Sequence, residues 1–165
     1  VNEEDKILVQ NAINLIDEAV NEVRTISHNM MPAALMEYGL VSAIKSFTNT
    51  INESKALHIN FNYKGMDNRL EENKEIALYR VVQEILNNMI KYAKADKITI
   101  ALNRINNKVH LLISDNGKGF DTSTIHQSKG IGWRNVFSRV SMINGEIDVI
   151  SAQGKGTDIR IDVII

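Results

Sequence analysis

Residues 109–120 read VHLLISDNGKGF, an apolar run that ends in an acidic residue and two glycines. Its first five residues have the apolar character of a buried strand, and Asp115 follows shortly after them. A carboxylate at the end of a strand can accept a hydrogen bond from an exocyclic amine. Gly117 and Gly119 would let the backbone pass close beneath a flat ring. The stretch therefore predicts a ligand site at a strand end, although a simple glycine turn would show the same pattern.

Strand and helix patterns extend to both sides of this stretch. Strands are expected at residues 58–63, 97–102, 108–114 and 147–152, with a further alternation at Ile159, Ile161, Val163 and Ile165. Helical spacing predicts helices at residues 40–52, 71–93 and 133–143. Because three strands follow one another with few helical interruptions, we expect a mixed, mainly antiparallel sheet with helices on one face. The predicted fold class is α+β, a two-layer sandwich.

A polar edge is expected on the helix at residues 71–93. Glu84, Asn88 and Lys91 lie four and three residues apart, so they share one helix face. An acid, an amide and a lysine on one edge could hold a hydrated Mg²⁺ and a polyphosphate, because this ion takes few protein oxygens and keeps its waters. A solvated polar face would explain the same pattern.

Two glycine segments follow along the chain. Residues 129–132, Lys-Gly-Ile-Gly, open the helix expected at 133–143, where free N–H groups attract phosphate. Residues 154–157, Gly-Lys-Gly-Thr, form a tight turn into the last strand, and the Thr157 hydroxyl could reach a ligand. Taken singly, the first segment could be a hinge and the second a hairpin.

The order of these four segments is more specific than any one of them. An acid-x-x-x-Asn helix, a strand with Asp-x-Gly-x-Gly, a Gly-x-Gly before a helix and a Gly-x-Gly-Thr before a strand follow one another over residues 57–165. This order resembles the ATP-binding domain shared by gyrase-like ATPases and sensor histidine kinases, the Bergerat fold. The sequence matches neither a Walker-type loop nor a Rossmann fingerprint.

The resemblance implies a role for each segment. Asn88 would bind Mg²⁺, Glu84 would orient the water shell of the metal or assist catalysis, and Lys91 would contact phosphate. Asp115 would read the adenine amine, with Gly117 and Gly119 beneath the ring and Thr157 nearby. Lys129, Gly130 and Gly132 would cradle phosphate and hinge the lid, and Tyr92 and Ile131 complete the expected nucleotide-binding set. In phosphoryl transfer, such placement and charge neutralisation supply most of the catalysis.

The N-terminal third predicts a long helix. Residues 5–31 contain neither Gly nor Pro, and their apolar residues alternate three and four apart, as in a coiled-coil seam. The seam consists of Val9, Ala12, Ile16, Ala19, Val23, Ile26 and Met30. Such a helix would be roughly 40 Å long and should project from the domain, unless it lies along it. Pro32 should end or kink the helix.

Residues 23–35 and 38–44 indicate a particular branch of this family. They are similar to the second helix of the dimerisation hairpin, and its linker, in the nitrate-sensor-like branch of histidine kinases. Residues 78–84 and the short stretch 121–129 also resemble that branch. The resemblance implies a partial dimerisation helix at 1–35 and an ATP-binding catalytic domain at 36–165. It also implies ATP and Mg²⁺, a homodimer through the N-terminal helix, and phosphoryl transfer to a histidine and then to an aspartate of a response regulator.

The acceptor histidine is where this chain departs from the family's pattern. That histidine is followed by an acidic residue, and the chain contains no His-Asp or His-Glu pair. His28 is followed by Asn29 and lies in the second-helix motif, so we interpret it as structural. We therefore expect the ATP-binding part of a histidine kinase without its acceptor helix. The alternatives are a nucleotide-binding regulatory module without phosphotransfer, and an anti-sigma-factor-type serine kinase, which the seam helix disfavours.

Composition excludes several other classes. The length of 165 residues allows one compact domain with an appended helix. Nineteen basic and 20 acidic residues give a net charge of −1, so no global positive field favours nucleic acid or an anionic membrane. The absence of cysteine excludes disulfides and thiolate metal sites. The apolar runs are far shorter than the ~20 residues that span a bilayer, so we expect a cytoplasmic segment without direct membrane contact.

Overall fold

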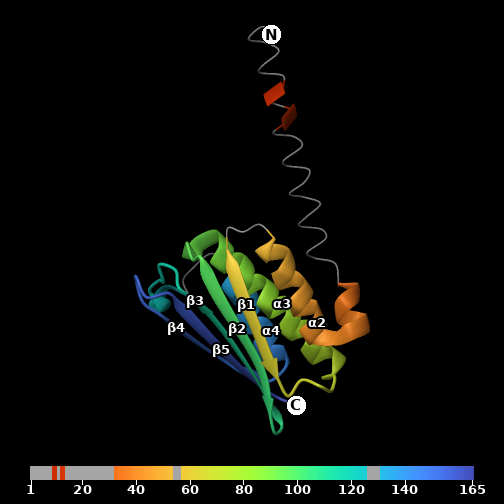
Figure 1. Cartoon of the computed structure of the whole chain (residues 1–165). Helices are drawn as coiled ribbons and strands as arrows, with labels where there is room; N and C mark the ends of the chain where they lie inside the picture. Colours follow the sequence, from red (N-terminus) through yellow and green to blue (C-terminus); the bar gives the residue numbers. More distant parts are fainter. Residues whose placement is uncertain (1–8, 11, 14–31, 54–56, 126–130) are drawn as a thin grey trace.

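A five-stranded sheet forms one layer of the molecule, and helices cover one of its faces (Figure 1). The computed structural model describes residues 9–10, 12–13, 32–53, 57–125 and 131–165. The strand order is β1-β2-β3-β5-β4, with β1 parallel to β2 and the other neighbouring pairs antiparallel. This arrangement confirms the predicted α+β sandwich with a mixed, mainly antiparallel sheet.

The elements lie close to their predicted positions. The strands are β1 (His58–Lys64), β2 (Lys97–Ile105), β3 (Lys108–Asp115), β4 (Gly145–Ser151) and β5 (Thr157–Ile164). The helices are α2 (Ala33–Asn52), α3 (Glu72–Asn88) and α4 (Ile131–Met142), with a π-helical turn at Met89–Ala93 and a 3₁₀ turn at Thr122–Thr124. The ends differ from the predicted ones by a few residues, except that α2 begins seven residues earlier than residue 40.

The core lies between the sheet and the helices. The central strands β2, β3 and β5 alternate buried and more exposed residues, as expected for a sheet with one covered face. The register places Ile113 between Ile100 and Ile159, and all three side chains are almost fully buried. Leu78 and Leu86 of α3 join the same cluster. This packing holds α3 in place above the strands that carry the polar turns.

Helix α2 is interrupted at Gly39, where φ is 85° and ψ is −177°. Gly39 therefore separates a short helical segment at residues 33–38 from the helix predicted at 40–52. Pro32, directly before α2, has an extended backbone with φ of −65° and ψ of 135°, and the expected end of the long helix before it lies outside the described residues. Leu35 is 1% exposed and belongs to the core. The core between the sheet and the helices thus includes Leu35 of this short segment.

The end of α2 is joined to the edge strand β1. The side-chain amide of Asn52 donates to the carbonyl of Ile59 at 2.9 Å, and its oxygen accepts from the N–H of the same residue at 2.7 Å. The two hydrogen bonds satisfy the backbone groups that Ile59 turns away from β2. Helix and sheet are therefore locked together at this edge.

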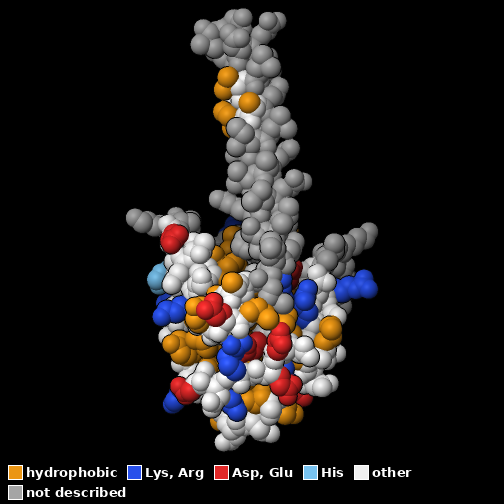
Figure 2. Space-filling model, turned by 90° about the vertical axis from the view of Figure 1, so that its right-hand side faces the viewer, with side chains coloured by type: hydrophobic (Ala, Val, Ile, Leu, Met, Phe, Trp, Pro, Cys, Tyr) orange, Lys and Arg blue, Asp and Glu red, His pale blue; other side chains and the backbone are white. Residues whose placement is uncertain are grey.

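Most of the predicted seam helix lies outside the described residues. Val9, Gln10, Ala12 and Ile13 are described, and they are helical. Within the described part of the chain, no helix is long and apolar enough to cross a membrane. On the face shown in Figure 2, basic and acidic side chains are interspersed with apolar ones.

Candidate functional site

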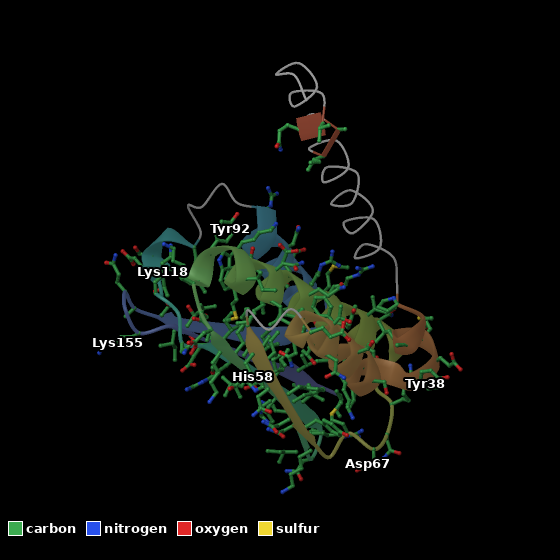
Figure 3. The ribbon with its side chains drawn as sticks, turned by 45° about the horizontal axis from the view of Figure 1, so that its top comes forward. Tyr38, His58, Asp67, Tyr92, Lys118 and Lys155 are labelled. Atoms are coloured by element: carbon green, nitrogen blue, oxygen red, sulfur yellow. The ribbon has the colours of Figure 1, made fainter. Side chains whose placement is uncertain are left out.

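A cavity of about 500 Å³ opens between the end of α3, the start of α4 and the ends of β3 and β5. Its volume lies within the range of small-molecule sites, roughly 300–1,000 Å³. It brings together most of the predicted site residues, namely Glu84, Asn88, Lys91, Tyr92, Asp115, Gly119, Gly132 and Thr157. Figure 3 shows Tyr92 and Lys118, which both line the cavity, at one end of the molecule and Tyr38 at the opposite end.

Asp115 is the buried acid of the cavity, with 8% of its surface exposed. It is the last residue of β3, and the register places it opposite Thr157 of β5. Its Oδ1 accepts a hydrogen bond from the N–H of Gly117 at 2.7 Å. Its Oδ2 is buried and has no hydrogen-bond partner among the described residues. Because an unpaired buried acceptor is costly, this oxygen is a ready partner for a donor on a ligand.

Burial raises the pKa of the Asp115 carboxyl above its ordinary value. The main cause is desolvation, which disfavours the charged form. The N–H of Gly117 and the proximity of Thr157 lower the pKa, and they offset the desolvation only in part. The carboxylate is therefore held in a site that a hydrogen-bond donor from a ligand would stabilise.

The glycine turn after Asp115 is packed against the end of the α3 region. The N–H of Lys118 donates to the carbonyl of Ala93 at 2.8 Å. A Cβ atom on Gly117 would overlap the same carbonyl oxygen, so position 117 has no room for a side chain. Gly117 is not among the residues that line the cavity, and it acts by holding Asp115 in place.

Asn116 also fixes this turn, and the sequence analysis assigned it no role. Its Oδ1 accepts from the N–H groups of Asp96 at 3.2 Å and Lys97 at 3.1 Å. Its Nδ2 donates to the Asp96 carboxylate at 2.6 Å. The position of Asn116 between Asp115 and Gly117 is a signal that could have indicated such a turn-stabilising role.

Ser151 is a second residue that the sequence analysis missed. The register places it opposite Thr157, and the two hydroxyl oxygens lie 3.0 Å apart. Ser151 Oγ accepts from the N–H of Phe120 at 3.0 Å and donates to the carbonyl of Gly156 at 2.8 Å. Since Ser151 has only one hydroxyl proton, which it donates to Gly156, Thr157 does not accept that proton. The oxygen of Thr157 therefore keeps acceptor capacity for a ligand.

The other end of the cavity is formed where α3 meets α4. A Cβ atom on Gly132 would lie 2.6 Å from Glu84 Oε1 and 2.8 Å from Asn88 Nδ2. The polar edge predicted on the helix therefore touches the first turn of α4, where backbone N–H groups are free of intrahelical partners. An amide oxygen, a carboxylate and a helix N-terminus thus lie at one wall, which suits a metal ion bound together with phosphate.

Helix α3 ends earlier than predicted. An α-helix was expected through residue 93, but α3 ends at Asn88 and a π-helical turn follows at Met89–Ala93. Lys91 and Tyr92 lie on this turn and both line the cavity. Wider turns of this kind occur often at functional sites, and no spacing in the sequence indicates them.

An apolar wall completes the cavity. Phe120 and Trp133 line it, with ring centroids 5.9 Å apart, and Trp133 lies 6.0 Å from Phe137. Ile85 and Met89 contribute further apolar surface. No ligand role was expected for Trp133 from the sequence, although its place directly after Gly132 is a signal for one. A wall of flat rings offers a planar apolar ligand a surface to stack on.

Not every predicted site residue can be placed. Lys129 and Gly130 lie outside the described residues. Ile131 is the first residue of α4. The roles of these three residues, like those of the other predicted site residues, stay predictions.

Comparisons with known proteins agree with this geometry. Residues 73–164 match the family model of histidine kinase-, DNA gyrase B- and HSP90-like ATPases. The signal transduction histidine-protein kinase/phosphatase DegS of Brevibacillus brevis is 32% identical over 92% of this chain and 39% of the relative. The oxygen sensor histidine kinase NreB of Staphylococcus carnosus is 28% identical over 92% of this chain and 44% of the relative. The chain thus spans about two fifths of the length of these curated relatives.

Solved structures share the fold at lower sequence identity. The histidine kinase AdeS of Acinetobacter baumannii superimposes with a TM-score of 0.63 at 16% identity, covering 99% of this chain and 85% of that one. The blue-light activated histidine kinase of Erythrobacter litoralis EL346 gives a TM-score of 0.62 at 19% identity, covering 73% of this chain and 40% of that one.

Proposed function

Because the chain belongs to the family of histidine kinase-, DNA gyrase B- and HSP90-like ATPases, we propose that its cavity binds ATP together with Mg²⁺. We propose further that the parent protein transfers the γ-phosphoryl group to a histidine, for relay to an aspartate of a response regulator. The unpaired Oδ2 of Asp115 carries the proposal. The exocyclic amine of adenine is a donor of the kind that this oxygen lacks.

We assign base binding to one end of the cavity, and phosphate and metal binding to the other. Asp115 and Thr157 would bind the base, against the apolar wall of Phe120 and Trp133. Lys91 and Tyr92 would contact the phosphates, with the first turn of α4 and the predicted residues Lys129, Gly130 and Ile131. Asn88 would hold Mg²⁺ and Glu84 would orient its water shell. When bound, the ion neutralises charge that develops on the transferred phosphoryl group.

The proposed homodimer is supported by apolar residues at the N-terminal end. Val9 is 57% exposed and Ile13 is 46% exposed on a helical segment. Two apolar residues four apart on a helix surface suit pairing with another helix. We propose that the N-terminal segment pairs with helices of a second copy, which bring the acceptor histidine within reach of the nucleotide.

Two experiments test this function. Calorimetry should show that the chain binds ADP and ATP, with tighter binding of ATP when Mg²⁺ is present. Incubation with γ-labelled ATP should leave the chain alone unlabelled and should label an added segment that carries a His-Asp or His-Glu helix. Failure to bind nucleotide would overturn the proposal for the cavity. Acid-labile label on the chain itself, abolished by His28→Ala, would make His28 the acceptor, and label on a serine would favour a serine kinase.

A further inference from the structure

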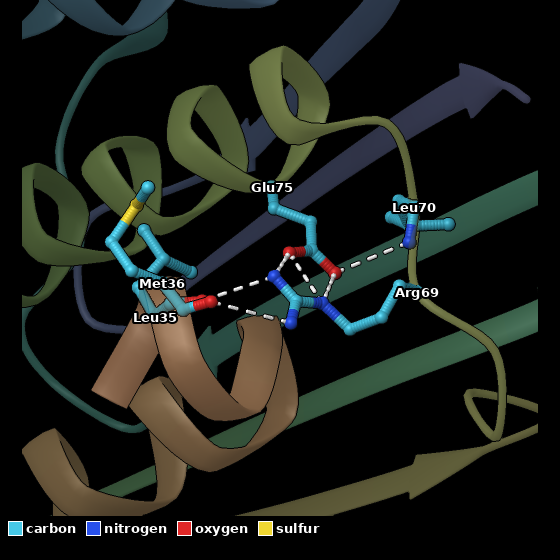
Figure 4. A network of polar contacts seen from close by, with 5 residues as sticks. All are labelled: Leu35, Met36, Arg69, Leu70 and Glu75. Atoms are coloured by element: carbon cyan, nitrogen blue, oxygen red, sulfur yellow. Dashed lines mark hydrogen bonds and ion pairs between the residues drawn. The ribbon is translucent and has the colours of Figure 1, made fainter. Parts of the chain in front are cut away.

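Arg69 connects the first turn of α3 with Leu35 and Met36, which are 34 and 33 residues away in sequence (Figure 4). Its Nε lies 2.9 and 3.0 Å from the two carboxylate oxygens of Glu75, and its Nη2 lies 2.6 Å from Oε2. Its Nη2 also donates to the carbonyl of Leu35 at 3.2 Å, and Nη1 to that of Met36 at 3.5 Å. Glu75 is 3% exposed and accepts a further bond from the N–H of Leu70 at 3.1 Å. We call the pair of Arg69 and Glu75 the clamp.

Arg69 of the clamp caps the C-terminal end of the short helical segment at residues 33–38. Leu35 and Met36 are near the end of that segment, where the interruption at Gly39 removes the partners of the last carbonyl groups. A cation that binds those carbonyls also interacts favourably with the C-terminal end of a helix. A Cβ atom on Gly39 would lie 2.7 Å from Arg69 Nε, so the guanidinium fits against the bend because residue 39 has no side chain.

Gly39 and Pro32 both have non-helical backbone, and the clamp determines at which of the two the chain can bend. Gly39 has the freer backbone by residue type, but it is buried and lies against Arg69. Leu35, on the other side of the bend, is buried in the core. Pro32 precedes α2 in an extended conformation, outside these contacts. Segment 33–38 is therefore part of the ATP-binding domain, and the first break available to the chain before it is Pro32.

The clamp is also connected to the nucleotide cavity through a single helix. Glu75 lies in the first turn of α3, and Asn88 is the last residue of the same helix. Leu78 and Leu86, between them, are fully buried. A helix packed along its whole length gives segment 33–38 a fixed position relative to the phosphate end of the cavity.

We propose that Arg69 is a positioning residue for phosphoryl transfer. With Glu75 it holds segment 33–38 on the ATP-binding domain, so that the backbone does not bend at Gly39. This inference rests on the proposed function for its kinetic consequence, and its structural part stands alone. Misplacement of reacting groups by about 1 Å can cost roughly 100-fold in rate, so the stiffness of the backbone at Gly39 affects transfer without any contact to ATP.

Hydrogen exchange tests the structural part in this chain. In Arg69→Gln, amides at residues 36–41 should exchange at least about tenfold faster, because the helix end loses its charged partner. Lys74→Gln is the matched control, since it removes the nearby ion pair with the exposed carboxylate of Glu71 at 3.2 Å and should leave these amides unchanged. The double variant Arg69→Met with Glu75→Leu avoids an unpaired buried carboxylate, and it should show the same faster exchange in a folded protein.

Kinetics in the presence of the acceptor segment test the positioning role. We expect kcat for transfer to fall about tenfold or more in the double variant, while KM for ATP and the affinity for ADP stay within about twofold of the unaltered chain. If amide hydrogen exchange at residues 36–41 were unchanged in these variants, the clamp would not be what fixes the backbone around Gly39. An equal loss of nucleotide affinity and kcat would overturn the positioning role. If the unaltered chain transferred no phosphoryl group, the proposed function would fail while the exchange result still decided the clamp.

Discussion

Replacement of Asp115 separates a role in binding from a role in folding. Asp115→Asn keeps an oxygen that can accept the Gly117 N–H bond, which is 2.7 Å long in the structure. It replaces the unpaired Oδ2 with an NH₂ group, which would face the amine of adenine donor to donor. Asp115→Ala removes both atoms. If Asp115 reads the base, both variants should lose nucleotide affinity.

The size of the loss follows from the type of hydrogen bond. A bond to a charged group contributes about 1.5–3 kcal/mol, which corresponds to a roughly 10–150-fold weaker affinity for ADP. The free energy of unfolding of the Asn variant without nucleotide should change by less than about 1 kcal/mol. The reason is that the lost carboxylate is desolvated and half unpaired, so it stabilises the empty protein little.

Because the pKa of Asp115 is raised, the stability of the protein and its affinity for ADP should both depend on pH. The folded protein holds this proton more tightly than the unfolded chain does. The contribution of Asp115 to the stability of the empty protein therefore falls as pH rises from the ordinary aspartate pKa through the raised one, and is constant above it. Affinity for ADP should change in the opposite direction and fall as pH is lowered through the raised pKa, because a protonated oxygen no longer accepts. Both trends should disappear in Asp115→Asn.

Calorimetric titration with ADP measures the affinity, and chemical denaturation measures the free energy of unfolding. Asp67→Asn is a suitable control, because Asp67 is exposed and lies at the end of the molecule away from Tyr92 (Figure 3). Unchanged ADP affinity in both Asp115 variants would remove this residue from base recognition.

Further predictions concern the other walls of the cavity and the core. Asn88→Ala should weaken Mg·ATP more than metal-free ATP in paired calorimetric titrations, and equal weakening would contradict the metal role. Gly117→Ala should lower ADP affinity at least about tenfold, since its Cβ must displace the turn that holds Asp115. ADP should change the fluorescence of Trp133, the single tryptophan, and Trp133→Leu should weaken ADP by roughly 2- to 10-fold; an unaltered spectrum at saturating ADP would argue against the apolar wall. Ile113→Ala should lower the free energy of unfolding by about 2–5 kcal/mol, measured by denaturant titration, since its side chain is fully buried.

Features with a local signature could be predicted from the sequence. The alternation in β3 and β5 and the four-residue spacing of Glu84 and Asn88 depend on the period of one element, so they indicated the sheet and the polar helix edge. The order of the glycine segments indicated a resemblance to a family, and that resemblance implied which residues would share a site.

Features that depend on partners distant in sequence could not be predicted. Ser151 contacts Thr157 of the cavity because the register of β4 and β5 places the two residues opposite each other, and register is a property of two strands. Arg69 reaches Leu35 across 34 residues without any periodic signal. The π-helical turn that carries Lys91 and Tyr92 has the same composition as ordinary helix.

The hydrogen bonds between Asn52 and Ile59 affect how the domain behaves at high local concentration. Strand β1 is at the edge of the sheet, where unpaired backbone groups can recruit a strand from another molecule and start aggregation. The amide of Asn52 occupies the N–H and the carbonyl of Ile59 as a neighbouring strand would. Asn60 and Asn62, which follow on the same strand, are polar and exposed. A second copy that approaches β1 therefore finds the backbone groups of Ile59 already occupied, which shortens the stretch of this edge that could pair with a strand of another molecule.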